Sequence, residues 1–152
     1  MKHGIVVGAA GMAVVIASCA GCSGKSTTGA SNPPAPAGPQ VIVDGKSQNV
    51  AGAVTCNPSG NRITIGIGDA ANGLGAVIST DNPPIVHAVG LGTVDGITLG
   101  YSDAAPGQGG SAGAAASGKS YQIKGTATGA DTSDPHQPKP VTKPFELDVT
   151  CP

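Results

Sequence analysis

The chain has 152 residues, with nine acidic side chains against eight basic ones, 25 glycines and 13 prolines. Aromatic residues make up only 2% of the sequence, so any core must be built from smaller aliphatic side chains. The near-neutral charge, without a cluster of lysine or arginine, argues against nucleic acid as a partner and against electrostatic docking on anionic lipid.

The first 22 residues indicate export and attachment to a membrane. A short basic start, Met1–His3, precedes an uncharged run over residues 4–18 and then small residues around two cysteines. This order is typical of a signal peptide, and a run of about 15 residues is shorter than the roughly 20 needed to span a bilayer as a helix. A cysteine directly after Ala-Gly or Ala-Ser is similar to the lipobox of bacterial lipoproteins, in which the thiol is joined to diacylglycerol and the new amine is acylated.

Two cysteines compete for the lipid. Cys19 follows the aliphatic-small-small run Ile16–Ser18, whereas Cys22 follows the preferred glycine but has Cys19 where leucine is usual. Cleavage before Cys22 would remove Cys19 with the signal and leave an even number of cysteines in the folded part. We therefore favour Cys22 and keep Cys19 as the alternative.

The residues after Cys22 predict a tether and then one domain. Residues 23–39 contain no aliphatic side chain larger than alanine, so they cannot bury enough surface to offset the entropy of ordering and should form a flexible spacer. Hydroxyl side chains near prolines are also similar to O-glycosylated stalks. The candidate glycosylation sites are Ser26, Thr27, Thr28 and Ser31. The expected organisation is a signal peptide (1–21), a lipidated tether (22–39) and a single domain (40–152).

From Gln40 onward, short segments alternate between apolar and polar residues, as strands with one buried face do. The turn pair Asp95-Gly96 predicts a hairpin between residues 89–94 and 97–101. In the last segment, one face would carry Phe145, Leu147, Val149 and Cys151. Six or seven such strands predict an all-β fold class, a small two-layer β-sandwich.

Three segments fit this pattern less well. Residues 69–79 begin with a candidate N-cap, Asp69, and are rich in alanine, which predicts a short helix and leaves an α+β fold as the alternative. Residues 104–118 are rich in glycine, alanine and serine and should form a mobile loop. Residues 131–144 contain four prolines and should form an irregular crossover before the last strand.

Cys56 and Cys151 are the two cysteines of the predicted domain. In an exported chain such a pair most simply forms a disulfide, and both residues fall on the apolar face of a predicted strand. Closing a loop of about 95 residues stabilises a fold by roughly 4–5 kcal/mol in the chain-entropy model. A metal site is disfavoured because no histidine stands at ligand spacing from either cysteine.

The sequence contains no recognisable catalytic motif. His87 should share a strand face with Ile85 and Val89 as a surface or partly covered residue, without a nucleophile or carboxylate in recognisable relation to it. His136, with Asp131 and Asp134, is better explained as part of a solvated loop than as a metal site. We therefore expect no catalytic residue, no metal and no enzymatic activity.

Five ordered words of the sequence together resemble the mycobacterial 19 kDa lipoprotein antigen family. They are CSGKSTTG (22–29), VIVDGKSQNVAGAVTC (41–56), NPPIVHAVGLGTVDGITLGY (82–101), KGTATGAD (124–131) and FELDVTC (145–151). The resemblance implies a triacylated lipoprotein of the cell envelope, lipidated at Cys22 and bridged between Cys56 and Cys151. It also implies stimulation of host Toll-like receptor 2 through the lipid, O-glycosylation of the tether, and no catalytic activity.

Two functions follow as hypotheses. The first is a surface antigen on the extracytoplasmic face of the membrane, non-enzymatic and without a cofactor beyond its covalent lipid. The second is a carrier whose apolar pocket holds an envelope lipid. Small residues on core faces, namely Gly52, Gly125 and Ala127, would leave room for such a pocket or would allow the sheets to pack closely.

Overall fold

The computed structural model describes residues 38–105 and 109–152. The strands of these residues belong to one antiparallel sheet with the order β2-β1-β10-β9-β7-β6-β5-β4-β3, and β8 pairs with β9 beside this path. Their bounds are β1 (Gln40–Val43), β2 (Lys46–Gln48), β3 (Val54–Ser59), β4 (Arg62–Ile67), β5 (Leu74–Ser79), β6 (Val86–Val94), β7 (Ile97–Ser102), β8 (Ser111–Ser117), β9 (Ser120–Asp131) and β10 (Lys139–Thr150). The all-β prediction is confirmed.

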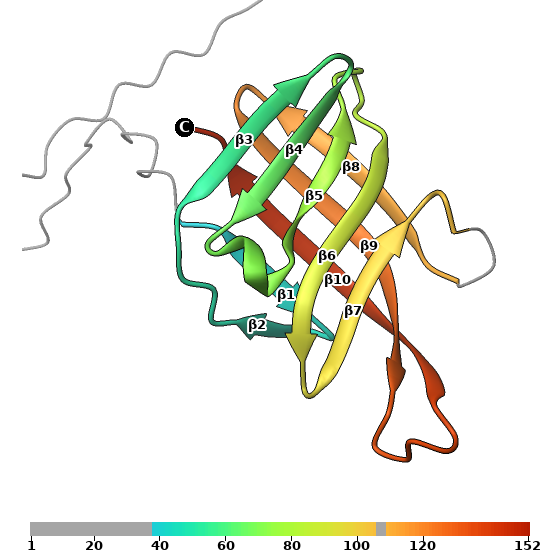
Figure 1. Ribbon diagram of the computed structural model, residues 1–152. Helices are drawn as coiled ribbons and strands as arrows, with labels where there is room; N and C mark the ends of the chain where they lie inside the picture. Colours follow the sequence, from blue (N-terminus) through green and yellow to red (C-terminus); the bar gives the residue numbers. More distant parts are fainter. Residues whose placement is uncertain (1–37, 106–108) are drawn as a thin grey trace, which may run out of the picture. The chain divides into compact units, whose positions relative to one another are not determined.

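The sheet curls so that two layers face each other. Figure 1 shows β3 to β7 in front, with β1, β8, β9 and β10 behind them and running in a crossing direction. The layers are continuous through the pairing of Gly100 on β7 with Thr128 on β9. Aliphatic side chains from both layers form one buried cluster, which includes Val41, Ile65, Leu99, Ile123 and Leu147. The two predicted layers are therefore halves of a single curled sheet.

The predicted hairpin and the final strand follow the sequence pattern. Asp95 and Gly96 join β6 to β7 with φ angles of 53° and 82°, and positive φ at both central residues is the turn geometry that matches strand twist. On β10, Phe145, Leu147 and Val149 are buried as expected. Alternation with Glu146 and Asp148 thus separates a core face from an outer polar face.

The helix predicted over residues 69–79 is wrong, apart from one turn. A 3-10 turn, η1 (Ala70–Asn72), begins where the Asp69 carboxylate accepts a hydrogen bond from the Ala71 amide at 3.1 Å, and it ends at Gly73 with φ of 60°. The following residues form β5, which pairs with β4 on one side and β6 on the other. Pairing on both sides outweighs the weak helical preference of this segment, so the α+β alternative is also wrong.

The loop expected over residues 104–118 is wrong where it includes β8. This strand pairs with β9 from Ser111 opposite Thr126 to Ser117 opposite Ser120. Gly125 permits the pairing, because a side chain there would meet the backbone carbonyl of Ser111. Alanine and glycine have low strand propensity, and here the partner strand decides the structure.

The irregular crossover expected over residues 131–144 is wrong as well. β9 and β10 pair from Asp131 opposite Lys139 along their whole lengths, so this region is a hairpin. Pro140 and Pro144 lie in the part of β10 that precedes its pairing with β1, which covers only residues 145–148. Proline is tolerated where a strand has one partner rather than two.

In the described part of the chain, we find no helix that has both the length and the apolar character required to cross a membrane.

Candidate functional site

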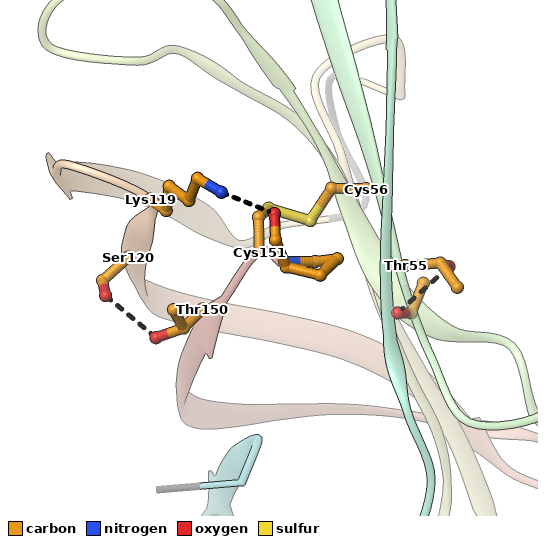
Figure 2. The surroundings of a disulfide bond; sticks show 8 residues. Thr55, Cys56, Lys119, Ser120, Thr150 and Cys151 are labelled. Carbon is orange, nitrogen blue, oxygen red and sulfur yellow. Dashed lines mark hydrogen bonds between the residues drawn. A yellow bond between two sulfur atoms is a disulfide. The ribbon is translucent and has the colours of Figure 1, made fainter. Parts of the chain in front are cut away.

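A disulfide joins the two layers at one edge of the domain. Cys56 lies on β3, the last strand of the sheet path, and Cys151 directly follows β10. Their Cα atoms are 5.7 Å apart, and both residues are partly buried. The expected pairing is present (Figure 2). The bond therefore fastens the free edge of the front layer to the back layer.

Hydrogen bonds hold the chain around this disulfide. The Cys151 amide donates to the Lys119 carbonyl, and the Lys119 ammonium donates to the Pro152 carbonyl, both at 2.9 Å. The hydroxyls of Ser120 and Thr150 lie 2.9 Å apart across β9 and β10 (Figure 2). These contacts secure the C-terminal residues against the β8–β9 turn, which is a structural arrangement rather than a reactive one.

A histidine–carboxylate pair is the feature that sequence reasoning missed. His87 Nδ1 lies 2.7 Å from Asp103 Oδ2, and the Asp103 amide donates to the His87 carbonyl at 2.9 Å. A bulge explains the miss, because Val77 pairs with Ala88 and Ile78 with Val86, which leaves His87 unpaired on β6. His87 therefore does not share the buried side of Val89, although it is partly covered, with 21% of its side chain exposed.

This pair does not extend to a nucleophile. Among the hydrogen bonds of residues 38–105 and 109–152, none connects the His87 ring to a serine, threonine or cysteine. The contacts instead join the bulge of β6 to the residue that follows β7. The pair is a polar link between two strands.

The loop around His136 uses its carboxylates to hold its own backbone. Asp134 accepts a hydrogen bond from the His136 amide at 3.0 Å, and Asp131 accepts one from the Ser133 amide at 2.9 Å. The hydrogen bond from Ser133 holds the pKa of Asp131 below its ordinary value. Within the described ranges, no three His, Cys, Asp or Glu side chains gather as metal ligands would.

An ion pair fixes the β1–β2 turn to β10. Lys143 Nζ donates to the Asp44 carboxylate at 2.8 Å, and the Asp44 amide donates to the Pro144 carbonyl at 2.9 Å. The side-chain hydrogen bond lowers the pKa of Asp44 and raises the pKa of Lys143. The first hairpin of the domain is thereby held to its last strand.

The small core residues allow close packing. A side chain at Gly52 would meet the backbone of Gly68, one at Gly125 would meet Ser111, and Ala127 is completely buried. A cavity of about 430 Å³ lies over β1, β8, β9 and β10, but its lining includes Gln40, Gln122 and Asp148, residues with polar side chains. None of these residues provides the apolar pocket that a lipid carrier requires.

The predicted modification sites lie outside the described residues. They are Cys22, with its alternative Cys19, and Ser26, Thr27, Thr28 and Ser31.

Comparison with known proteins places these observations beside relatives. Residues 32–151 match the family model described as Mycobacterium 19 kDa lipoprotein antigen. The chain is 46% identical to lipoprotein LpqH of Mycobacterium tuberculosis H37Rv, with 99% of each chain covered. It is 56% identical to lipoprotein LpqH of Mycobacterium avium over 76% of this chain and 69% of that one. A putative lipoprotein of Mycobacteroides abscessus is 34% identical, with 99% of both chains covered.

Proposed function

The chain belongs to the Mycobacterium 19 kDa lipoprotein antigen family, and from this membership we propose that it is a non-enzymatic antigen anchored in the cell envelope by acylated Cys22. The observation that carries the proposal is the extent of the similarity. It covers 99% of the chain and therefore includes the N-terminal segment with its two candidate cysteines. The relatives are named as lipoproteins, which supports a lipid at that end.

The lipid supplies the attachment in this proposal. A single acyl chain gives only marginal and reversible binding to a bilayer, whereas two or three chains on one cysteine make the anchor stable. Diacylglycerol on the Cys22 thiol and an acyl group on its amine would provide them. The domain would then stand on the extracytoplasmic side, separated from the bilayer by residues 23–39.

We further propose that host Toll-like receptor 2 recognises the acylated terminus. Receptors of this kind bury acyl chains, and each buried methylene contributes roughly 0.8 kcal/mol. The domain has no comparable apolar surface, since Ile85 is the one large hydrophobic residue exposed within residues 38–105 and 109–152. The stimulating chemistry is therefore assigned to the lipid and not to the sheet.

The hydroxyl side chains beside the tether prolines support a proposal of O-glycosylation at Ser26, Thr27, Thr28 and Ser31. Intact mass of protein from the native envelope should show hexose increments, and replacing these four residues with alanine should abolish them. A mass equal to that of the unmodified lipoprotein would contradict this part of the proposal.

Detergent partition tests the anchor directly. Wild-type protein should enter the detergent phase, and Cys22→Ala should move to the aqueous phase because its acyl chains are lost. Cys19→Ala is the matched control and should partition like the wild type. If Cys19→Ala becomes aqueous while Cys22→Ala stays with detergent, the lipid is on Cys19.

The carrier hypothesis has lost the observation that suggested it. Gly52, Gly125 and Ala127 serve close packing, as described above. Native mass spectrometry of protein from a mycobacterial envelope decides between the two functions. A specifically co-purified lipid, in addition to the covalent one, would support the carrier, and its absence would support the antigen without a pocket.

A further inference from the structure

Most free edges of the sheet carry features that discourage pairing with another chain. β2 has only three residues and includes Lys46, and β3 contains Pro58. The part of β10 not paired with β1 contains two lysines and two prolines, Lys139, Pro140, Lys143 and Pro144. Short strands, lysines and prolines are the usual means by which natural sheets prevent edge-to-edge association.

β8 carries none of these features. It has seven residues, Ser-Ala-Gly-Ala-Ala-Ala-Ser, without charge or proline, and most of them are exposed. In the described part of the chain, the ladder beside it is with β9 alone. β8 is therefore a long, flat and uncharged edge.

The unpaired backbone groups of β8 can be assigned to particular residues. The Ser111 amide points toward β9, where it donates to Thr126 Oγ1 at 3.0 Å. Residues alternate in direction along an antiparallel strand, so Ala112, Ala114 and Ala116 direct their N–H and C=O groups away from β9. These groups form a row to which one further strand could bind.

Apolar surface lies next to this row. Ala116 and Pro84 line the same cavity of about 290 Å³, and the residue after Pro84 is Ile85, which is 55% exposed. An exposed large aliphatic side chain beside an open strand edge adds a hydrophobic contribution to any association there.

We propose that β8 is a dimerisation edge, at which it pairs antiparallel with β8 of a second copy of this chain. An uncharged partner is required, because β8 offers no charge to pair with a charged peptide. A second β8 matches the first in length, in small side chains and in lack of charge. Antiparallel pairing of identical strands also obeys two-fold symmetry, which closes the assembly at two copies.

Matched lysine variants test the proposal. Ala115 on β8 and Asn57 on β3 are both exposed residues of edge strands. The full chain, purified in detergent and measured by light scattering at low salt, should be a concentration-dependent dimer. Ala115→Lys places a charge from each copy on the same face of the joined sheet and should raise the dissociation constant at least tenfold, while Asn57→Lys should leave it unchanged. A wild type that is monomeric throughout, or an unaffected Ala115→Lys dimer, would overturn the proposal.

Cysteine crosslinking provides a second measurement that does not depend on the lysine variant. Single cysteines at the outward positions Gly113, Ala115 and Ser117 would be oxidised in intact envelopes, with Asn57→Cys as the matched control. At least one β8 position should give a crosslinked dimer on a non-reducing gel, and position 57 should not. Equal crosslinking at positions 57 and 113–117 would indicate random collision and contradict a specific edge.

Discussion

The first 39 residues and the domain after them differ in the chemistry that they contain. The N-terminal segment has two of the four cysteines and only two charged side chains, Lys2 and Lys25, whereas all nine acidic residues lie in the domain. The domain uses its polar groups internally, in the disulfide surroundings, the His87–Asp103 pair and the Asp44–Lys143 ion pair. On our proposal, attachment and host recognition belong to the segment and stability belongs to the domain. Variants of each region should therefore have separable effects.

The largest effect should come from the lipidated cysteine. Cys22→Ala should abolish stimulation of Toll-like receptor 2 reporter cells, because the acyl chains are lost, and should leave the melting temperature of the domain unchanged. A synthetic acylated peptide covering Cys22–Thr28 is the positive control. Full stimulation by lipid-free protein would break the division and transfer recognition to the domain.

The next effect concerns the disulfide. Replacing both Cys56 and Cys151 with serine should lower the free energy of unfolding by roughly 4 kcal/mol, since the bond closes a long loop in the unfolded chain. Denaturant unfolding measures this loss, and receptor stimulation by the acylated variant should remain. Free thiols that alkylate in native protein without prior reduction would show that the bond is absent from the envelope form.

A pair of neighbouring residues on β10 tests the assignment of the two faces. Leu147 is completely buried, and Leu147→Ala should cost about 2–5 kcal/mol of stability through lost burial and a residual cavity. Asp148 points to the outer face, so Asp148→Ala should change stability by no more than about 0.5 kcal/mol. Thermal unfolding of the two variants gives the comparison, and equal losses would mean that the faces are assigned incorrectly.

The smallest effect should come from the Asp44–Lys143 ion pair, and it should depend on pH. The hydrogen bond from Lys143 lowers the pKa of Asp44, so the stabilisation from Asp44 is complete above its unfolded pKa of about 4 and is lost as the pH falls through the folded pKa. The raised pKa of Lys143 stabilises the fold below about pH 10.4 and loses this contribution as the pH rises through the folded value.

Lys143→Met should therefore be slightly less stable than the wild type at pH 7, with a difference that shrinks at pH 2–3. Lys139→Met, which removes a lysine from the same strand, is the matched control and should show no such change with pH. Denaturant midpoints at the two pH values measure both variants. A difference that stays constant between them would show that the ion pair does not contribute.

The parts of the fold that were predicted correctly are those with strong local signals. Asp95-Gly96 specifies its turn through two residues that tolerate positive φ, and Phe145, Leu147 and Val149 specify a face through their period of two. β8 lacks both signals, because alternating alanine and glycine carries no contrast between core and solvent. Its structure depends on β9, a partner that the local sequence does not identify.

The same limit applies to the polar contacts. The disulfide could be expected because the predicted domain contains only two cysteines, Cys56 and Cys151. The contact of His87 with Asp103 could not, since it depends on one unpaired residue in β6 that changes the direction of the side chain. Pro140 and Pro144 indicated irregular chain because proline usually interrupts a ladder, but a strand with one free side accommodates them.

The pairing of β1 with β10 has a consequence for the order in which this protein can fold. Gln40 lies opposite Asp148, so the first strand of the domain finds its partner only in the last residues of the chain. Contacts between residues so far apart in sequence are slow to form, because the intervening loop must close first. A growing or truncated chain that lacks β10 leaves both β1 and β9 without their shared neighbour. The domain therefore becomes complete only after its synthesis has ended, and a loss of about 12 residues at the C-terminus should prevent folding rather than trim it.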